Sequence, residues 1–106
     1  ALDDFSFSRC TRLTNITILN GVKSIGNRAF SGCTELTSIT IPDGVTSMGI
    51  GAFSCCTELT SITIPDSVTH IDSMAFGKCD KLVVRCAKKS YACKYAEKIG
   101  LKVEII

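Results

Sequence analysis

Two stretches of the sequence, LTSITIPDGV at 36–45 and LTSITIPDSV at 59–68, differ at one position and lie 23 residues apart. A related stretch, LTNITILNGV at 13–22, precedes them by the same interval. Further columns keep this period, among them Phe7, Phe30, Phe53 and Phe76, and Cys10, Cys33, Cys56 and Cys79. Self-similarity at a fixed period of this length is typical of solenoids, in which each repeat stacks on the next. The sequence therefore predicts a stack of 23-residue coils with one continuous apolar core.

Each repeat contains an alternating segment such as Leu36, Ile39 and Ile41, rich in β-branched residues, which predicts a short strand with one buried face. Pro42 and Pro65 follow this segment. Because proline lacks the amide hydrogen that a parallel ladder needs, we expect the strands to end there. Stacked coils place these strands side by side in a short parallel sheet.

The rest of each repeat carries apolar residues at a spacing closer to helical than extended, as in Val45, Met48, Ala52, Phe53 and Cys56. This spacing predicts a tight turn and a short helical or irregular segment on the convex side. Gly26 and Gly49, replaced by Asp72 in the third copy, are expected at a sharp corner that requires a left-handed backbone.

The repeat pattern changes after Leu82, because Arg85 and Ala87 stand where isoleucines are expected. Residues 88–106 are predicted to form a cap with a helix and a last strand. Ser90 is the expected N-cap and Gly100 the residue after the helix. Apolar residues of the helix and strand are Ala92, Tyr95, Ala96, Ile99, Val103 and Ile105. We therefore expect a solenoid of about 3.5 to 4 coils over residues 1–87, truncated at its N-terminus, and a C-terminal cap over 88–106.

The segment from Leu59 to Val68 and the repeats around it resemble the BspA-like subfamily of leucine-rich repeats. This resemblance implies an α/β repeat fold, a right-handed leucine-rich-repeat solenoid with a short parallel sheet. It also implies a secreted or cell-surface bacterial protein that adheres to a protein or glycan ligand, such as host matrix or another cell. A spacer that presents other domains, or an intracellular protein-binding scaffold, is the alternative. The matching columns are core positions, so the resemblance identifies no functional residues.

Outward positions of the strands form a polar ladder, which is the candidate binding surface: Asn15, Thr17, Ser38, Thr40, Ser61 and Thr63. In solenoids the strand face usually lines a rigid concave surface, which lowers the cost of ordering a large partner. Small hydroxyl residues are equally suited to a solvated sheet, so both interpretations stay open.

The seven cysteines are read first as packing residues, since four of them follow the repeat. Cys86 and Cys93 flank the start of the cap helix and are candidates for a disulfide. His70, the only histidine, has Asp72 as its one nearby carboxylate. Asp43 and Asp66 follow their strands, but Asn20 breaks that row, which disfavours calcium. No catalytic, metal or cofactor motif is present, so we expect no enzyme.

The composition and charge limit the kinds of partner that the chain is expected to bind. Hydrophobic residues are 45% of the 106 and the net charge is +2. No apolar run approaches the roughly 20 residues that span a bilayer. Eight of the 12 Lys and Arg residues follow position 77, without a nucleic-acid motif, so we expect a solvated basic end and no nucleic-acid partner. The uncapped N-terminal coil is expected to self-associate through the face that contains Leu13, Ile16 and Ile18.

Overall fold

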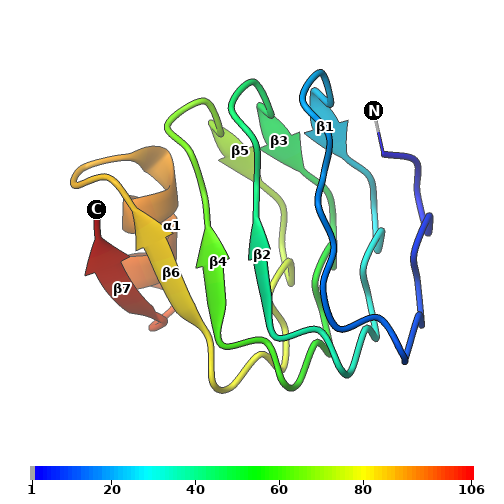
Figure 1. The fold of residues 1–106 in the computed structure, drawn as a ribbon. Coiled ribbons are helices and arrows are strands. Elements are labelled where there is room, and N and C mark those ends of the chain that lie inside the picture. The colour runs from blue at the N-terminus through cyan, green and yellow to red at the C-terminus, as the bar shows by residue number, and fades with distance from the viewer. Residues whose placement is uncertain (1) are drawn as a thin grey trace.

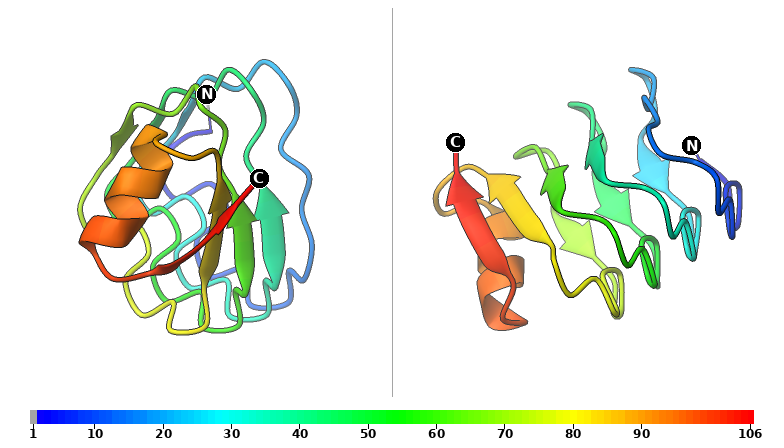
Figure 2. Two further views of the ribbon diagram at one scale, coloured as in Figure 1. Left: turned by 90° about the vertical axis from the view of Figure 1, so that its left-hand side faces the viewer. Right: turned by 60° about the horizontal axis from the view of Figure 1, so that its bottom comes forward.

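The chain winds into a stack of coils that run from the N-terminus at one end to a cap at the other (Figure 1). The computed structural model describes residues 2–106. Two parallel sheets run along the stack, and successive coils step along its axis (Figure 2). The predicted leucine-rich-repeat solenoid with a parallel sheet is confirmed.

The larger sheet contains the strands that the sequence predicts. Its order is β2 (Ser38–Thr40), β4 (Ser61–Thr63), β6 (Val83–Cys86) and β7 (Lys102–Ile105). An isolated bridge between Asn15 and Ser38 continues it into the first coil. The amide of Ile41 still donates to the Thr63 carbonyl at 2.9 Å, and the chain turns away at Pro42. The prolines therefore end the strands as expected.

The smaller sheet was not predicted. It contains β1 (Ser24–Ile25), β3 (Ser47–Met48) and β5 (His70–Ile71), again parallel. Each strand has one buried apolar residue and one partly or fully exposed polar residue. Two residues are too few to show an alternating pattern in the sequence. The coil is thus flattened between two sheets.

The segments after the smaller sheet take the irregular alternative, a series of turns, and α1 is the one helix within residues 2–106. Stacking explains this outcome, because their amides donate to carbonyls of neighbouring coils, as Phe53 does to Ala75 at 2.8 Å. An α-helix would use these groups internally. Gly26 and Gly49 are required for a different reason from the predicted one, since neither has a positive φ. A Cβ on Gly49 would lie 2.7 Å from the Asn27 amide nitrogen.

The fourth coil continues the repeat with a shift of one residue, so Arg85 does not take the isoleucine position that a constant period of 23 assigns to it. Ile62 pairs with Val84, and Thr63 pairs with Arg85, a separation of 22 instead of 23. The shift places Val84 inside, at 1% exposure, and Arg85 outside, where it donates to Glu104 at 2.8 Å. Because a one-residue slip exchanges the two faces of a strand, the shorter spacing keeps the apolar residue in the core.

The core consists of aligned columns. Rings of Phe7, Phe30, Phe53 and Phe76 stack one above another, with centroid separations of 5.3, 5.1 and 5.9 Å. Phe30 and Phe53 are fully buried. The shared apolar column predicted from the 23-residue period is therefore present in the structure.

The helix α1 (Tyr91–Lys98) covers the end of the stack beyond β5 and β6 (Figures 1 and 2). Ser90 is its N-cap and accepts from the Cys93 amide at 3.1 Å. At its other end Gly100, at φ 85°, allows Leu101 to donate back to the Ala96 carbonyl at 2.9 Å, which closes the helix in a Schellman motif. Its buried residues are Ala92, Cys93 and Ala96; Ile99 is exposed, unlike the prediction.

Two tyrosines of α1 complete the edge of the smaller sheet. The hydroxyl of Tyr91 accepts from the Ile71 amide at 3.2 Å, and that of Tyr95 donates to the Asp72 carbonyl at 3.4 Å. The larger sheet ends differently, because its edge strand β7 pairs in parallel with β6. We propose that residues 88–106 act as the cap, with β7 as a continuation of the sheet and not a separate unit.

Candidate binding groove

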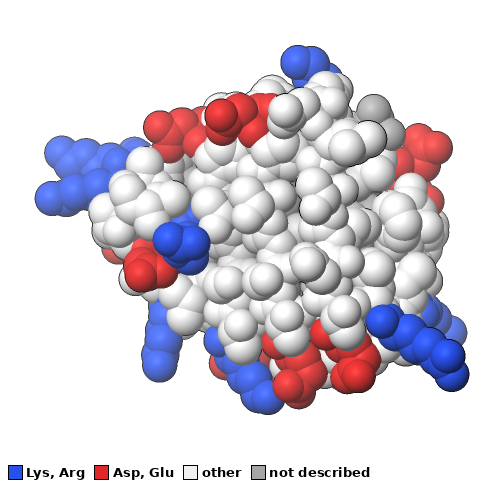
Figure 3. All heavy atoms as spheres, in the orientation of Figure 1, with Lys and Arg blue, Asp and Glu red and all other residues white. Residues whose placement is uncertain are grey.

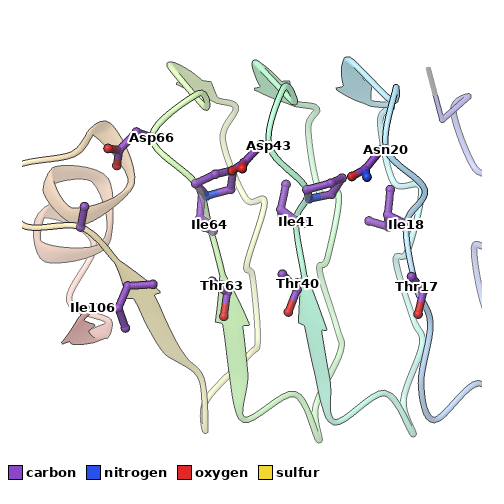
Figure 4. A pocket seen from close by; sticks show the side chains of 13 residues that line it. Thr17, Ile18, Asn20, Thr40, Ile41, Asp43, Thr63, Ile64, Asp66 and Ile106 are labelled. Atoms are coloured by element: carbon purple, nitrogen blue, oxygen red, sulfur yellow. The ribbon is translucent and has the colours of Figure 1, made fainter.

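A groove of about 480 Å³ crosses the coils at the carboxyl ends of the larger sheet's strands. Three successive coils supply equivalent residues to it, so its walls consist of rows (Figure 4). One row is Thr17, Thr40 and Thr63, the next is Ile18, Ile41 and Ile64, and the third is Asn20, Asp43 and Asp66. Pro42, Pro65, Ala87 and Ile106 complete the lining. We call this surface the strand-end groove.

The repeat itself builds the rows. Thr40 and Thr63 are register partners in the parallel sheet, and adjacent strands lie about 4.8 Å apart. The isoleucines beside them are almost fully buried and form an apolar floor. The Pro-Asp dipeptides that follow place the carboxylates of Asp43 and Asp66 on the outer edge, exposed to solvent. The groove is thus a hydroxyl row and a carboxylate row on either side of an apolar floor.

The six predicted strand-face residues form two separate rows in the structure, and one of these rows lines the groove. Thr17, Thr40 and Thr63 line the groove. Asn15, Ser38 and Ser61 form a separate row two residues earlier, which lies on the sheet face outside the groove lining. Sequence reasoning weighed Asp43 and Asp66 only as calcium ligands and missed their place beside the threonines. The signal was the Pro-Asp pair repeated directly after two strands.

Charge is arranged around this face and not on it. The outer surface over β2 and β4 is largely uncharged, with acidic groups along the edges above and below it and basic groups around the rim, at the cap end and at the N-terminal end (Figure 3). Neither Asp43 nor Asp66 forms an ion pair within residues 2–106. The groove therefore offers two carboxylates and no cation to a ligand.

The cysteine column is buried and hydrogen-bonded. The thiols of Cys33, Cys56 and Cys79 donate to the carbonyls of Phe7, Phe30 and Phe53, at 3.2, 3.1 and 3.1 Å. Burial raises the pKa of Cys56 to about 12 and the pKa of Cys79 to about 11, because desolvation disfavours the thiolate. These groups pack the core and are unsuited to nucleophilic chemistry.

The buried thiols make stability depend on pH in the alkaline range. Their folded pKa values exceed the ordinary 9.0, so they are protonated in both states below about pH 9. Above it the unfolded chain releases protons that the folded chain retains, and the free energy of unfolding should fall by about 1.4 kcal/mol per pH unit for each thiol. Urea unfolding at about pH 8 and pH 10.5 measures this slope. Cys56→Ala should flatten it, and an unchanged slope would contradict the assignment.

The remaining candidates for chemistry lie apart from the groove. His70 is exposed on β5, and its Nε2 lies 2.7 Å from Asp72 Oδ1, so Asp72 is indeed its partner. In the described part of the chain, no three His, Cys, Asp or Glu residues are grouped to hold a metal ion. Nor does any described helix have the length and apolar character to cross a membrane.

Cys86 and Cys93 both carry free thiols in the structure, and a disulfide between them stays a prediction. Cys86 points into the core from β6, and Cys93 lies in the first turn of α1. Burial raises the pKa of Cys86, because desolvation disfavours the thiolate. Both thiols are buried where α1 packs against β6.

The chain is similar to known proteins over nearly its whole length. Residues 1–96 match the family model described as BspA type leucine-rich repeat region, in six copies. The structure is similar to the crystal structure of a leucine-rich repeat protein from Bacteroides ovatus, with a TM-score of 0.85 and 34% sequence identity. That similarity covers 99% of this chain and 28% of the other chain. Comparison with curated proteins gives no match.

Proposed function

Because the chain belongs to the BspA-type leucine-rich repeat family, we propose that it is a non-catalytic module that binds a protein partner along the strand-end groove. The observation that supports this most is the groove itself, about 480 Å³ and built from three coils in register. Repeat proteins commonly bind through such extended surfaces, because rigid stacked coils need little reordering.

The groove lining favours an extended polypeptide with cationic side chains. Its apolar floor suits aliphatic side chains, and Asp43 and Asp66 suit lysine or arginine. A chain of five residues spans about 17 Å, which is comparable to the width of the three coils. An uncharged glycan would form hydrogen bonds with the threonine hydroxyls and the carboxylates but no ion pair with them.

A peptide of five alternating lysine and valine residues tests this proposal by NMR titration of the labelled protein. We expect shifts at Thr40, Thr63 and their neighbours, and affinity about fivefold lower for the double variant Asp43→Asn, Asp66→Asn, since exposed ion pairs contribute about 0.2–1 kcal/mol each. The control Glu35→Gln, Asp80→Asn changes the net charge equally away from the groove. Equal weakening by both double variants, or shifts elsewhere, would contradict the groove as the site.

Family membership also supports a role in adhesion at the bacterial surface, which is part of our proposal. Digestion of intact cells that produce the full-length protein, with a protease that does not enter them, should release peptides of this chain. Their release only after lysis would favour the intracellular scaffold instead.

The first coil supports a further part of the proposal, self-association of the 106-residue chain. Its apolar residues line a hollow of about 210 Å³, and Leu19 is 75% exposed. Leu13 and Ile16 of the predicted face are half-buried, whereas Ile18 is already buried. We expect a second copy to cover this hollow, so light scattering should give the molar mass of a dimer. Ile16→Lys should restore the mass of the monomer. A monomer at high concentration of the unaltered chain would refute the idea.

A further inference from the structure

A second, smaller cleft lies on the turn segments that follow the smaller sheet, and we call it the Arg28/Lys78 cleft. Its volume is about 180 Å³, and its lining comes from three successive coils: Arg28, Ile50, Ser54, Cys55, Met74, Gly77 and Lys78. Ile50 is 43% exposed and Met74 65% exposed, although both side chains are large and apolar. The cleft therefore combines exposed apolar surface with two cations, and no carboxylate lines it.

The backbone of this cleft is held in an unfavourable conformation. Arg28, Cys55, Met74 and Lys78 all have positive φ, between 54° and 62°. The equivalent positions in neighbouring coils include Gly32 and Gly51, at φ 76° and 62°. Glycine adopts this region without steric cost, whereas other residues are destabilised there. Phe5 and Arg9 occupy the same two positions in the first coil, both at φ 60°, so the repeat imposes this conformation on each coil and the cleft side chains project from it.

Glycines elsewhere in the cleft make room for these side chains. A Cβ on Gly51 would lie 3.4 Å from both Cγ and Nη1 of Arg28, so the arginine extends across that glycine. A Cβ on Gly77 would lie 3.1 Å from the methyl carbon of Met74. The two long side chains therefore pass over these glycines along the cleft walls, with their outer sides exposed to solvent.

The dimensions and charge define the chemistry of a ligand. An apolar cavity of about 150 Å³ accommodates a benzene ring, so this cleft has room for one large apolar side chain. Neither Arg28 nor Lys78 forms an ion pair within the described residues 2–106. We propose that the Arg28/Lys78 cleft binds an acidic peptide segment, with an apolar side chain between Ile50 and Met74 and carboxylates on the two cations. This site is separate from the strand-end groove and opposite to it in charge.

The chain contains two methionines, which provide a reporter and an internal reference. Met74 lines the cleft, whereas Met48 is fully buried in the core. In protein labelled with ¹³C at the methionine methyl groups, the acetylated and amidated tripeptide Asp-Phe-Glu should shift the Met74 signal and leave Met48 unchanged. The neutral tripeptide Asn-Phe-Gln should bind at least threefold more weakly. An unmoved Met74 signal, or equal affinity for both peptides, would overturn the proposal.

Glycine variants separate binding from folding. Arg28→Gly and Lys78→Gly remove a cation and relieve positive φ, so each should raise Tm and weaken the acidic peptide about fivefold. Lys89→Gly is the matched control, because Lys89 has φ 67° but lies outside the cleft. It should raise Tm without changing affinity. Equal weakening by Lys89→Gly would indicate a nonspecific charge effect and overturn the site. A Met74 shift with phosphatidylserine vesicles but not with the peptide would instead identify a membrane surface and overturn it as well.

Discussion

Replacing Phe53 with alanine is expected to lower the free energy of unfolding by about 3–5 kcal/mol, the range for a large aromatic side chain deleted from a core. Phe53 is fully buried, and its ring lies between Phe30 at 5.1 Å and Phe76 at 5.9 Å. Deletion therefore removes packing with two neighbouring coils at once and leaves a cavity between them. Urea unfolding followed by circular dichroism measures the loss.

Phe5→Ala is the appropriate control for Phe53→Ala. It deletes the same atoms from a side chain that is 58% exposed, so little packing is lost. We expect a change below about 1 kcal/mol, because the side chain is exposed and alanine keeps the same Cβ at the positive φ of 60°. Comparable losses for the two variants would mean that Phe53 is not at the centre of a shared core.

Gly49→Ala is expected to destabilise the chain by about 1–3 kcal/mol, the usual cost of forcing atoms into a packed site. The added Cβ would lie 2.4 Å from Asn27 Oδ1 and 2.7 Å from the Asn27 nitrogen. That oxygen also accepts from the Ile50 amide at 2.9 Å, so it cannot move away without losing a hydrogen bond. Thermal unfolding should show a clear decrease in Tm.

Gly77→Ala is the control, because it tests whether replacing any glycine in the repeat destabilises the chain as Gly49→Ala does. Its nearest contact would be the flexible end of Met74, at 3.1 Å, which can rotate away. We expect a much smaller effect than at Gly49. A loss at Gly77 equal to that at Gly49 would indicate that the contact with Asn27 does not determine the result.

The repeat period was sufficient to predict the solenoid, because stacking converts periodicity in the sequence directly into contact. The Phe53 column and the N-cap at Ser90 are visible as residue types at fixed intervals. The glycine at Gly49 was noticed, but its reason was misread, since the constraint comes from Asn27 in the previous coil. Ile50 replaces the asparagine in the second copy and Asp72 replaces the glycine in the third, and this paired change was the available signal.

Features that depend on register between coils were harder to predict. The shift that places Val84 in the core removes one residue from the period, so alignment by a constant 23 assigned Arg85 to an apolar column. A helical segment was considered for the turns because Ala52 and Phe53 fit a helical spacing. The hydrogen bonds between coils, which determine the outcome, cannot be recognised from the sequence of a single repeat. The groove at Asp43 likewise depends on how three coils stack.

The alignment of equivalent residues on successive coils supports every proposal above, and nuclear Overhauser contacts at a separation of 23 residues test it most directly. In a spectrum of protein labelled at phenylalanine rings and threonine methyl groups, we predict contacts from Phe30 to Phe53 in the core. We predict equivalent contacts from Thr40 to Thr63 in the groove, because strand partners lie about 4.8 Å apart. Absence of both sets in folded protein would contradict the stack, and absence of the threonine set alone would contradict the groove.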